Sequence, residues 1–222
     1  MSERDNIYAR IKEALMLKAH ASHGYGLPLV EEHRRVMPPV GVTIEEQLTL
    51  FANNASELKA TFKFVKDAAE LAAELKVLSA AEQWQRAATH AGSLAHSQTM
   101  ALGLATIVTS YGYDKDELEL CDVGITECDA LIAQTGTVLV TSRSAGGRAL
   151  SCLPSHHVVI AHRSQLVADL PEAMSLVKQR YSGNYPSMIS FITGPSRTGD
   201  IERIIVLGAH GPKRLTIFCL QN

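Results

Sequence analysis

The sequence contains no basic tract, and its basic residues are not interleaved with aromatic side chains. Nucleic-acid-binding proteins depend on such basic surfaces, so this class of function is not indicated. The 21 basic and 23 acidic residues give a formal charge of −2. No apolar run approaches the roughly 18 residues that would indicate a membrane-spanning helix. The first residues, MSERDNIYARIKEAL, lack the apolar core of a signal peptide, so we expect a cytoplasmic protein.

Closely spaced cysteine pairs are also absent. The four cysteines are scattered along the chain: Cys121, Cys128, Cys152 and Cys219. Structural zinc and iron–sulfur sites normally show C-x-x-C pairs, so we expect half-buried thiols in a reducing compartment. Three histidines lie in an irregular segment, at spacings too irregular to favour a metal site: His20, His23 and His33. We therefore predict no metal centre, and a metal assembled from distant residues is the alternative.

The composition is typical of a globular protein. Of the 222 residues, 46% are apolar and 20% are charged, and we expect one compact unit. Residues 5–19 have the apolar spacing of a short amphipathic helix, and residues 20–42 are a connector rich in glycine and proline.

A second helix is predicted to begin after Thr43, because Thr43 and Glu46 have the spacing of a capping box. Apolar residues then recur every three or four positions from Ile44 to Ala72, which predicts one continuous helix. Asn53 and Asn54 are poor helix formers that allow a break. The stripe is longer than a small core needs, so we expect its first half to pack on a second subunit as a homodimer.

From residue 75 onward, short apolar runs alternate with amphipathic segments. Strands are predicted at residues 75–79, 101–110, 120–126, 135–142, 148–154, 156–162, 187–193, 203–208 and 214–220. Helices are predicted at residues 79–90, 127–134 and 169–181. This alternation is typical of a layered α/β fold with a mostly parallel sheet. We divide the chain into a helical lead-in, residues 1–74, and an α/β domain, residues 75–222.

Three polar loops follow predicted strands, at residues 124–137, 193–202 and 208–214. In open α/β sheets, ligands bind beyond the carboxyl ends of the strands, so these loops are candidates for a binding site. The candidate ligand-binding residues are Thr126, Thr135, Gly136, Thr137, Gly194, Pro195, Ser196, Arg197, Thr198, Asp200, His210 and Gly211.

The loop at 193–202 carries the strongest anion-binding signal. Gly194 and Pro195 turn the chain, and Gly199–Asp200 is predicted to begin a short helix whose free N–H groups hold an anion. The planar guanidinium of Arg197 suits a carboxylate or a phosphate. The alternative is a capped turn in which Arg197 pairs with Asp200 or Glu202.

The other two loops are open to structural interpretations as well. Thr126 is predicted to cap the helix at 127–134, and the hydroxyls of Thr135 and Thr137 flank a tight turn. His210 lies in a turn, where histidine is more often structural than catalytic. A triad of Ser196, Asp200 and His210 is not favoured, because the G-x-S-x-G motif is absent. The G-x-x-x-x-G-K motif of a P-loop is absent too.

Taken in order, four segments resemble the LUD-domain family, in particular its lactate-utilization protein C group. They are GITECDALIAQTGTVLV, GGRALSCLPSHHVVI, FITGPSRTGDIE and LGAHGP, and the similarity runs over about residues 121–220. The resemblance implies a three-layer, Rossmann-like α/β/α sandwich, similar to sugar-phosphate isomerases and CoA transferases.

The resemblance also implies a role in a three-component system that oxidises L-lactate to pyruvate, in which sister subunits carry iron–sulfur clusters. This chain would be the cluster-free component, binding a small anionic ligand or a partner at the strand-end loops, and neither a cofactor nor a catalytic residue is assigned by the resemblance. The alternative is a free-standing enzyme of the cyclo-ligase or CoA-transferase type, acting on a nucleotide, acyl-CoA or folate-like substrate. Glu127 and Glu202 are the nearest candidates for its nucleophile, and the available basic residues are Arg148, Arg197 and Lys213.

Overall fold

The structure is a computed structural model that describes residues 3–16, 39–201 and 204–221. The chain divides into two units, residues 1–38 and residues 39–222. In the first unit, helix α1 (Glu3–Met16) confirms the predicted helix over residues 5–16, and Ile7 and Ile11 are exposed on it. The three histidines of the connector lie outside the described residues. The predicted boundary at residue 74 falls inside a helix of the second unit.

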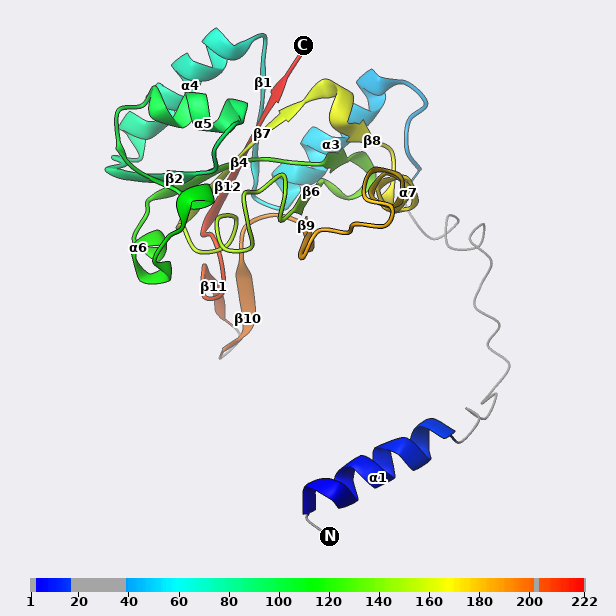
Figure 1. The fold of residues 1–222 in the computed structure, drawn as a ribbon. Helices are drawn as coiled ribbons and strands as arrows, with labels where there is room; N and C mark the ends of the chain where they lie inside the picture. Colours follow the sequence, from blue (N-terminus) through cyan, green and yellow to red (C-terminus); the bar gives the residue numbers. More distant parts are fainter. Residues whose placement is uncertain (1–2, 17–38, 202–203, 222) are drawn as a thin grey trace. The chain divides into compact units, whose positions relative to one another are not determined.

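A six-stranded sheet forms the centre of the second unit (Figure 1). Its strands, in spatial order, are β1 (Thr61–Val65), β12 (Arg214–Leu220), β7 (His156–His162), β4 (Val123–Glu127), β2 (Arg86–Thr89) and β3 (Ala105–Val108). All neighbouring pairs are parallel. The central strands β4, β7 and β12 are buried along almost their whole length, which explains their continuous apolar runs.

A second, four-stranded sheet packs on one face of the first. Its order is β8 (Leu166–Val167), β5 (Ala130–Ile132), β6 (Thr137–Thr141) and β9 (Ile189–Ile192). A separate antiparallel hairpin, β10 (Arg197–Ile201) and β11 (Ile204–Leu207), leads the chain from the second sheet back to β12.

The helices complete the layers. Helices α4 (Ala68–Ala81) and α5 (Leu94–Met100) cover one face of the large sheet. On the other face, α3 (Ile44–Glu57) and the small sheet enclose the largest apolar cluster, and α7 (Leu170–Arg180) covers the far side of the small sheet. The remaining helices are α6 (Lys115–Glu119) and the single turns η1 (Thr109–Tyr111), η2 (Ala133–Thr135) and η3 (Arg163–Gln165). The predicted α/β class with a mostly parallel sheet is confirmed.

The predicted continuous helix from Ile44 to Ala72 is wrong. The capping box of Thr43 and Glu46 is present, but α3 ends at Glu57, Lys59 has a positive φ of 67°, and the edge strand β1 follows. The run TFKFV alternates in a way that fits a strand as well as a helix face, and pairing with β12 decides for the strand. Leu48, Phe51 and Ala55 pack into the core of the same chain, so the apolar stripe no longer argues for a homodimer.

Four further predicted elements are wrong for related reasons. The short apolar runs were ambiguous between helix and strand, and neighbours distant in sequence decided between them. Residues 75–79 lie inside α4, and residues 79–90 contain the end of α4 and strand β2. Residues 127–134 contain β5, because β6 and β8 pair with it. Residues 148–154 form turns, and no hairpin joins them to β6.

Candidate functional site

A pocket with a volume of about 230 Å³ lies at the amino ends of β7 and β12. Its residues come from three connecting loops, from β9 and from the two large-sheet strands. They are Ser151, Cys152, His157, Phe191, Ile192, Thr193, Gly194, Pro195, Ser196, His210, Gly211, Pro212 and Leu215. The volume is below the roughly 300 to 1,000 Å³ of pockets for drug-sized ligands, so the pocket suits a small molecule.

The base of the β10–β11 hairpin brings two sides of this pocket together. The Ser196 backbone N–H donates to the Pro212 carbonyl at 2.9 Å, and the Gly208 N–H donates to the Ser196 carbonyl at 3.0 Å. The backbone N–H and carbonyl of Ser196 are thus hydrogen-bonded within the chain, and its hydroxyl is the group that can bind a ligand. Two loops that the sequence indicated separately therefore form one wall.

Five of the predicted ligand-binding residues line the pocket: Gly194, Pro195, Ser196, His210 and Gly211. Arg197 is exposed beside it, and its Nη2 lies 3.6 Å from the position that a Cβ on Gly194 would take. Thr198 and Asp200 lie in β10, so the short helix predicted to begin at Gly199 is wrong. The side chain of Asp200 lies outside the described part of the chain.

Two predicted threonines reach the pocket through a third. Thr135 Oγ1 donates to Thr137 Oγ1 at 2.8 Å, and Thr137 Oγ1 lies 2.9 Å from Thr193 Oγ1. Thr137 is buried, and Thr193 is an exposed residue of the pocket wall. Thr135 and Thr137 therefore lie behind Thr193, and neither lines the pocket.

Gly136 and Gly194 are required by the backbone of the chain and by its contact with α3. Gly136 has a φ of +61°, and a Cβ there would lie 2.7 Å from the Ala55 backbone nitrogen in α3. Gly194 has a φ of +86°, and a Cβ there would lie 2.8 Å from the carbonyl oxygen of Leu58, at the end of α3. Both glycines allow the backbone of α3 to lie close to these two loops, because a side chain at either position would clash with the backbone of Ala55 or Leu58.

Thr126 is buried on β4 and does not cap a helix, since β5 follows it. Its Oγ1 lies 2.9 Å from Nε2 of His157 on the neighbouring strand. His157 is 1% exposed, and burial lowers its pKa to about 3, so the imidazole is neutral. Its Nδ1 has no hydrogen-bond partner among the described residues. Thr126 therefore contributes to the pocket indirectly, through His157.

This pocket does not lie beyond the carboxyl ends of the parallel strands, where the sequence predicts the site. The loop after Ile192 leaves β9, which belongs to the small sheet, and the loop at 208–213 enters β12 at its amino end. Glu127 is at the carboxyl end of β4, where its Oε1 accepts from the Leu94 N–H at 2.8 Å. Arg148 and Lys213, the other predicted cations, are exposed and do not line the pocket.

Sequence reasoning missed four polar residues of the pocket: Ser151, Cys152, His157 and Thr193. His157 follows His156 at the start of an apolar run, and adjacent strand residues face opposite sides of a sheet. That alternation indicates that one histidine of the pair points to each face. The sequence did not indicate which face holds a pocket.

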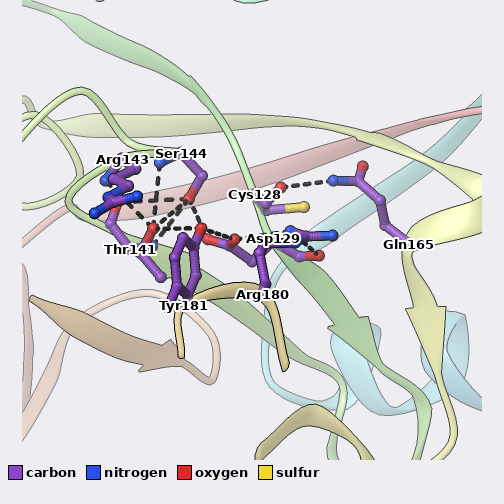
Figure 2. Close-up of polar contacts among 8 residues, drawn as sticks. All are labelled: Cys128, Asp129, Thr141, Arg143, Ser144, Gln165, Arg180 and Tyr181. Atoms are coloured by element: carbon purple, nitrogen blue, oxygen red, sulfur yellow. Dashed lines mark hydrogen bonds and ion pairs between the residues drawn. The ribbon is translucent and has the colours of Figure 1, made fainter. Parts of the chain in front are cut away.

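Away from the pocket residues, the buried carboxylate of Asp129 ties the small sheet to α7 (Figure 2). The Ser144 hydroxyl donates to Asp129 Oδ2 at 2.6 Å, and Arg180 Nη1 donates to Oδ1 at 2.8 Å. The Tyr181 hydroxyl donates to Oδ1 as well. Every partner is a side chain of the same chain, so we interpret this network as structural.

The described part of the chain has neither a membrane-spanning helix nor a metal-binding cluster. Within residues 3–16, 39–201 and 204–221, no helix is long and apolar enough to cross a membrane. The same residues contain no group of three histidine, cysteine or carboxylate side chains arranged to hold a metal ion. All four cysteines are free thiols, and Cys152 is the exposed one.

The chain is similar in sequence to proteins of one named group. Proteins named lactate utilization protein C are 42% identical in Shouchella clausii over 98 residues and 36% identical in Bacillus subtilis over 124 residues. These matches cover 44% and 53% of this chain, and 43% and 52% of the relatives, so the chain spans about half the length of the relatives it matches.

The fold is also seen in a solved structure. A crystal structure of a DUF162 family protein from Deinococcus radiodurans has a TM-score of 0.64 and 22% identity, and covers 81% of this chain and 99% of that one. The sequence model of the LUD domain matches residues 48–220, from α3 to the end of β12 and including every residue of the pocket. The chain therefore belongs to the LUD-domain family.

Proposed function

We propose that this chain takes part in lactate utilization as a component that binds a small organic anion in the pocket at the amino ends of β7 and β12. The names of the Shouchella clausii and Bacillus subtilis relatives support the process, lactate utilization. The scattered cysteines support a component without iron–sulfur clusters. Oxidation of L-lactate to pyruvate would then depend on partner subunits that carry the clusters.

One observation carries the proposal of an anionic ligand: the pocket wall has hydrogen-bonding side chains but no carboxylate. Ser151, Thr193 and Ser196 are among its residues, and the guanidinium of Arg197 lies beside Gly194 at its rim. A carboxylate ligand would meet donors on the wall and a cation at the rim, and no negative side chain of the wall would repel it. The small volume suits an acid of the size of lactate or pyruvate.

The proposal is tested by thermal unfolding of the isolated chain with L-lactate, pyruvate, phosphate, NAD, ATP, acetyl-CoA and folate. A ligand at about 100 times its Kd adds about 2.7 kcal/mol of stability, which raises the Tm of a chain of this size by roughly 5 to 10 °C. We expect a shift with lactate or pyruvate that Arg197→Ala reduces. Lys66→Ala, an exposed cation after the carboxyl end of β1, is the matched control and leaves the shift unchanged.

A second assay tests whether the isolated chain oxidises L-lactate without partner subunits. The isolated, metal-free chain is expected not to reduce an artificial electron acceptor when supplied with L-lactate. Turnover by the isolated chain would contradict the proposed role. A thermal shift with acetyl-CoA, ATP or folate but with neither small acid would instead favour an enzyme of the transferase or ligase type.

A further inference from the structure

The hydrogen bonds that end at the pocket have a direction, and its meaning for a ligand rests on the proposed function. Two hydrogen-bond chains reach the pocket wall from the interior. One runs from Thr126 to His157, and the other runs from Thr135 through Thr137 to Thr193. Because a hydroxyl has a single proton, the groups inside each chain determine what its last member can offer.

In the first chain, the hydroxyl of Thr126 is buried and hydrogen bonds, among the described residues, with Nε2 of His157 alone. If Nε2 carried the imidazole proton, the Thr126 proton would have no acceptor and Nδ1 would have no donor. If Nδ1 carries the proton, Thr126 donates to Nε2 and a single polar group, the Nδ1–H, is left without a partner. Unsatisfied buried polar groups are unfavourable, so the second arrangement is the stable one.

In the second chain, Thr135 donates to Thr137 Oγ1 at 2.8 Å. The single proton of Thr137 has two candidate acceptors, Thr193 Oγ1 at 2.9 Å and the Thr135 carbonyl at 3.5 Å. The shorter contact is the stronger hydrogen bond. Thr193 Oγ1 therefore accepts from Thr137, and its own O–H is free to donate at the pocket surface.

We propose that Thr193 Oγ1–H and His157 Nδ1–H, a buried and unpartnered group of a residue that lines the pocket, are the specificity-determining donors of this pocket, and that they select a small acid by its acceptor oxygens. The ligand class is a monocarboxylate, with a 2-oxo acid favoured over its 2-hydroxy counterpart. To two donors an oxo group presents acceptor lone pairs alone, whereas a hydroxyl presents a proton as well as lone pairs. Thr126, Thr135 and Thr137 are positioning residues that act through these two donors.

The first test needs no ligand. Long-range ¹H–¹⁵N spectra of the protein with labelled histidine report which ring nitrogen carries the proton, and His157→Gln assigns the His157 signals. We expect His157 to be neutral and protonated at Nδ1 in the free protein. A neutral ring protonated at Nε2 would overturn the inference, whatever the protein binds.

The second test is calorimetric binding of pyruvate and L-lactate, with inorganic phosphate as a third probe. We expect pyruvate to bind more tightly than L-lactate, and Thr193→Val to weaken pyruvate binding about tenfold. Thr193→Ser keeps the donor and is expected to retain binding. Thr61→Val, at an exposed position on the edge strand β1, is the matched control and changes nothing.

The histidine is tested by two substitutions that retain different nitrogens. His157→Asn keeps an N–H donor near the position of Nδ1, whereas His157→Gln keeps one near Nε2. We expect His157→Asn to bind pyruvate more tightly than His157→Gln does. If pyruvate binds but Thr193→Val and both histidine variants leave its affinity unchanged, the inference fails while the proposed function stands. Absence of binding by all three probes would overturn both.

Discussion

Thr126 Oγ1 on β4 and His157 Nε2 on β7 lie 2.9 Å apart, and both side chains are buried. This contact joins a residue that the sequence singled out to one that it did not. It also explains how Thr126 serves the pocket without lining it. The contact exists because β4 and β7 are parallel neighbours, with Thr126 in register with Val159 and therefore two residues from His157.

The buried histidines make the stability of the protein depend on pH. Burial lowers the pKa of His156 to about 4 and that of His157 to about 3, and charge on His156 lowers the latter further. In the unfolded chain both rings take up a proton below about pH 6.5. The unfolded state then binds more protons than the folded state, so stability falls as the pH falls through that value.

Each histidine contributes roughly 1 kcal/mol between pH 7.5 and 5.5, so the pair lowers the free energy of unfolding by roughly 2 to 3 kcal/mol. Urea titrations at the two pH values measure this difference. His157→Gln is expected to remove about half of it. Equal free energies of unfolding at pH 7.5 and 5.5 would show that the imidazoles are not held neutral.

The approach of α3 to Gly136 predicts a large effect of one added methyl group. Gly136→Ala combines a positive φ with contact against the α3 backbone, and we expect a loss of at least about 3 kcal/mol. Gly183→Ala is the matched control, because Gly183 has a φ of +77° and no atom within 4 Å of the added Cβ. We expect a loss of about 1 kcal/mol there.

The two glycine variants are compared by urea denaturation. Their difference isolates the contact with α3 from the backbone strain that they share. Equal losses of stability in the two variants would mean that α3 shifts to accommodate the added methyl group at no measurable cost.

The Asp129 network predicts a stability effect unrelated to ligand binding. Asp129→Asn removes the charge that pairs with Arg180 and turns an acceptor into a donor beside Ser144 or Tyr181. We expect a loss of about 2 to 4 kcal/mol by chemical denaturation. Asp116→Asn, whose side chain is 78% exposed, should change stability by less than about 0.5 kcal/mol. A similarly small change in Asp129→Asn would contradict the assigned role.

Thiol reactivity tests the position of Cys152. Burial raises the pKa of Cys121 and Cys128, and that of Cys219 to about 11, and these thiols are shielded. We therefore expect one fast-reacting thiol in the native protein and four in denaturant. The fast phase should disappear in Cys152→Ser and slow when a ligand occupies the pocket. Several fast thiols in the native state would contradict the burial of the other three.

Some of the candidate site could be predicted because its residues lie in two short polar runs. Gly194 to Ser196 and His210–Gly211 stand between strands, and turn chemistry indicated them without knowledge of the fold. Thr193 and His157 could not be found in this way. Thr193 directly follows the apolar strand β9 and His157 is the second residue of β7, and both become pocket residues because β9 and β7 belong to sheets packed against each other.

The sequence by itself determined the α/β class, helix α7, the capping box at Thr43 and Glu46, and the strands with long apolar runs. These features depend on residues close together in the chain. Tertiary structure alone decided that residues 61–65 and 130–132 are strands, because both runs also fit a helix and pairing with distant strands stabilised the extended form. It also decided the position of the pocket, since the β10–β11 hairpin returns the chain to the amino end of β12.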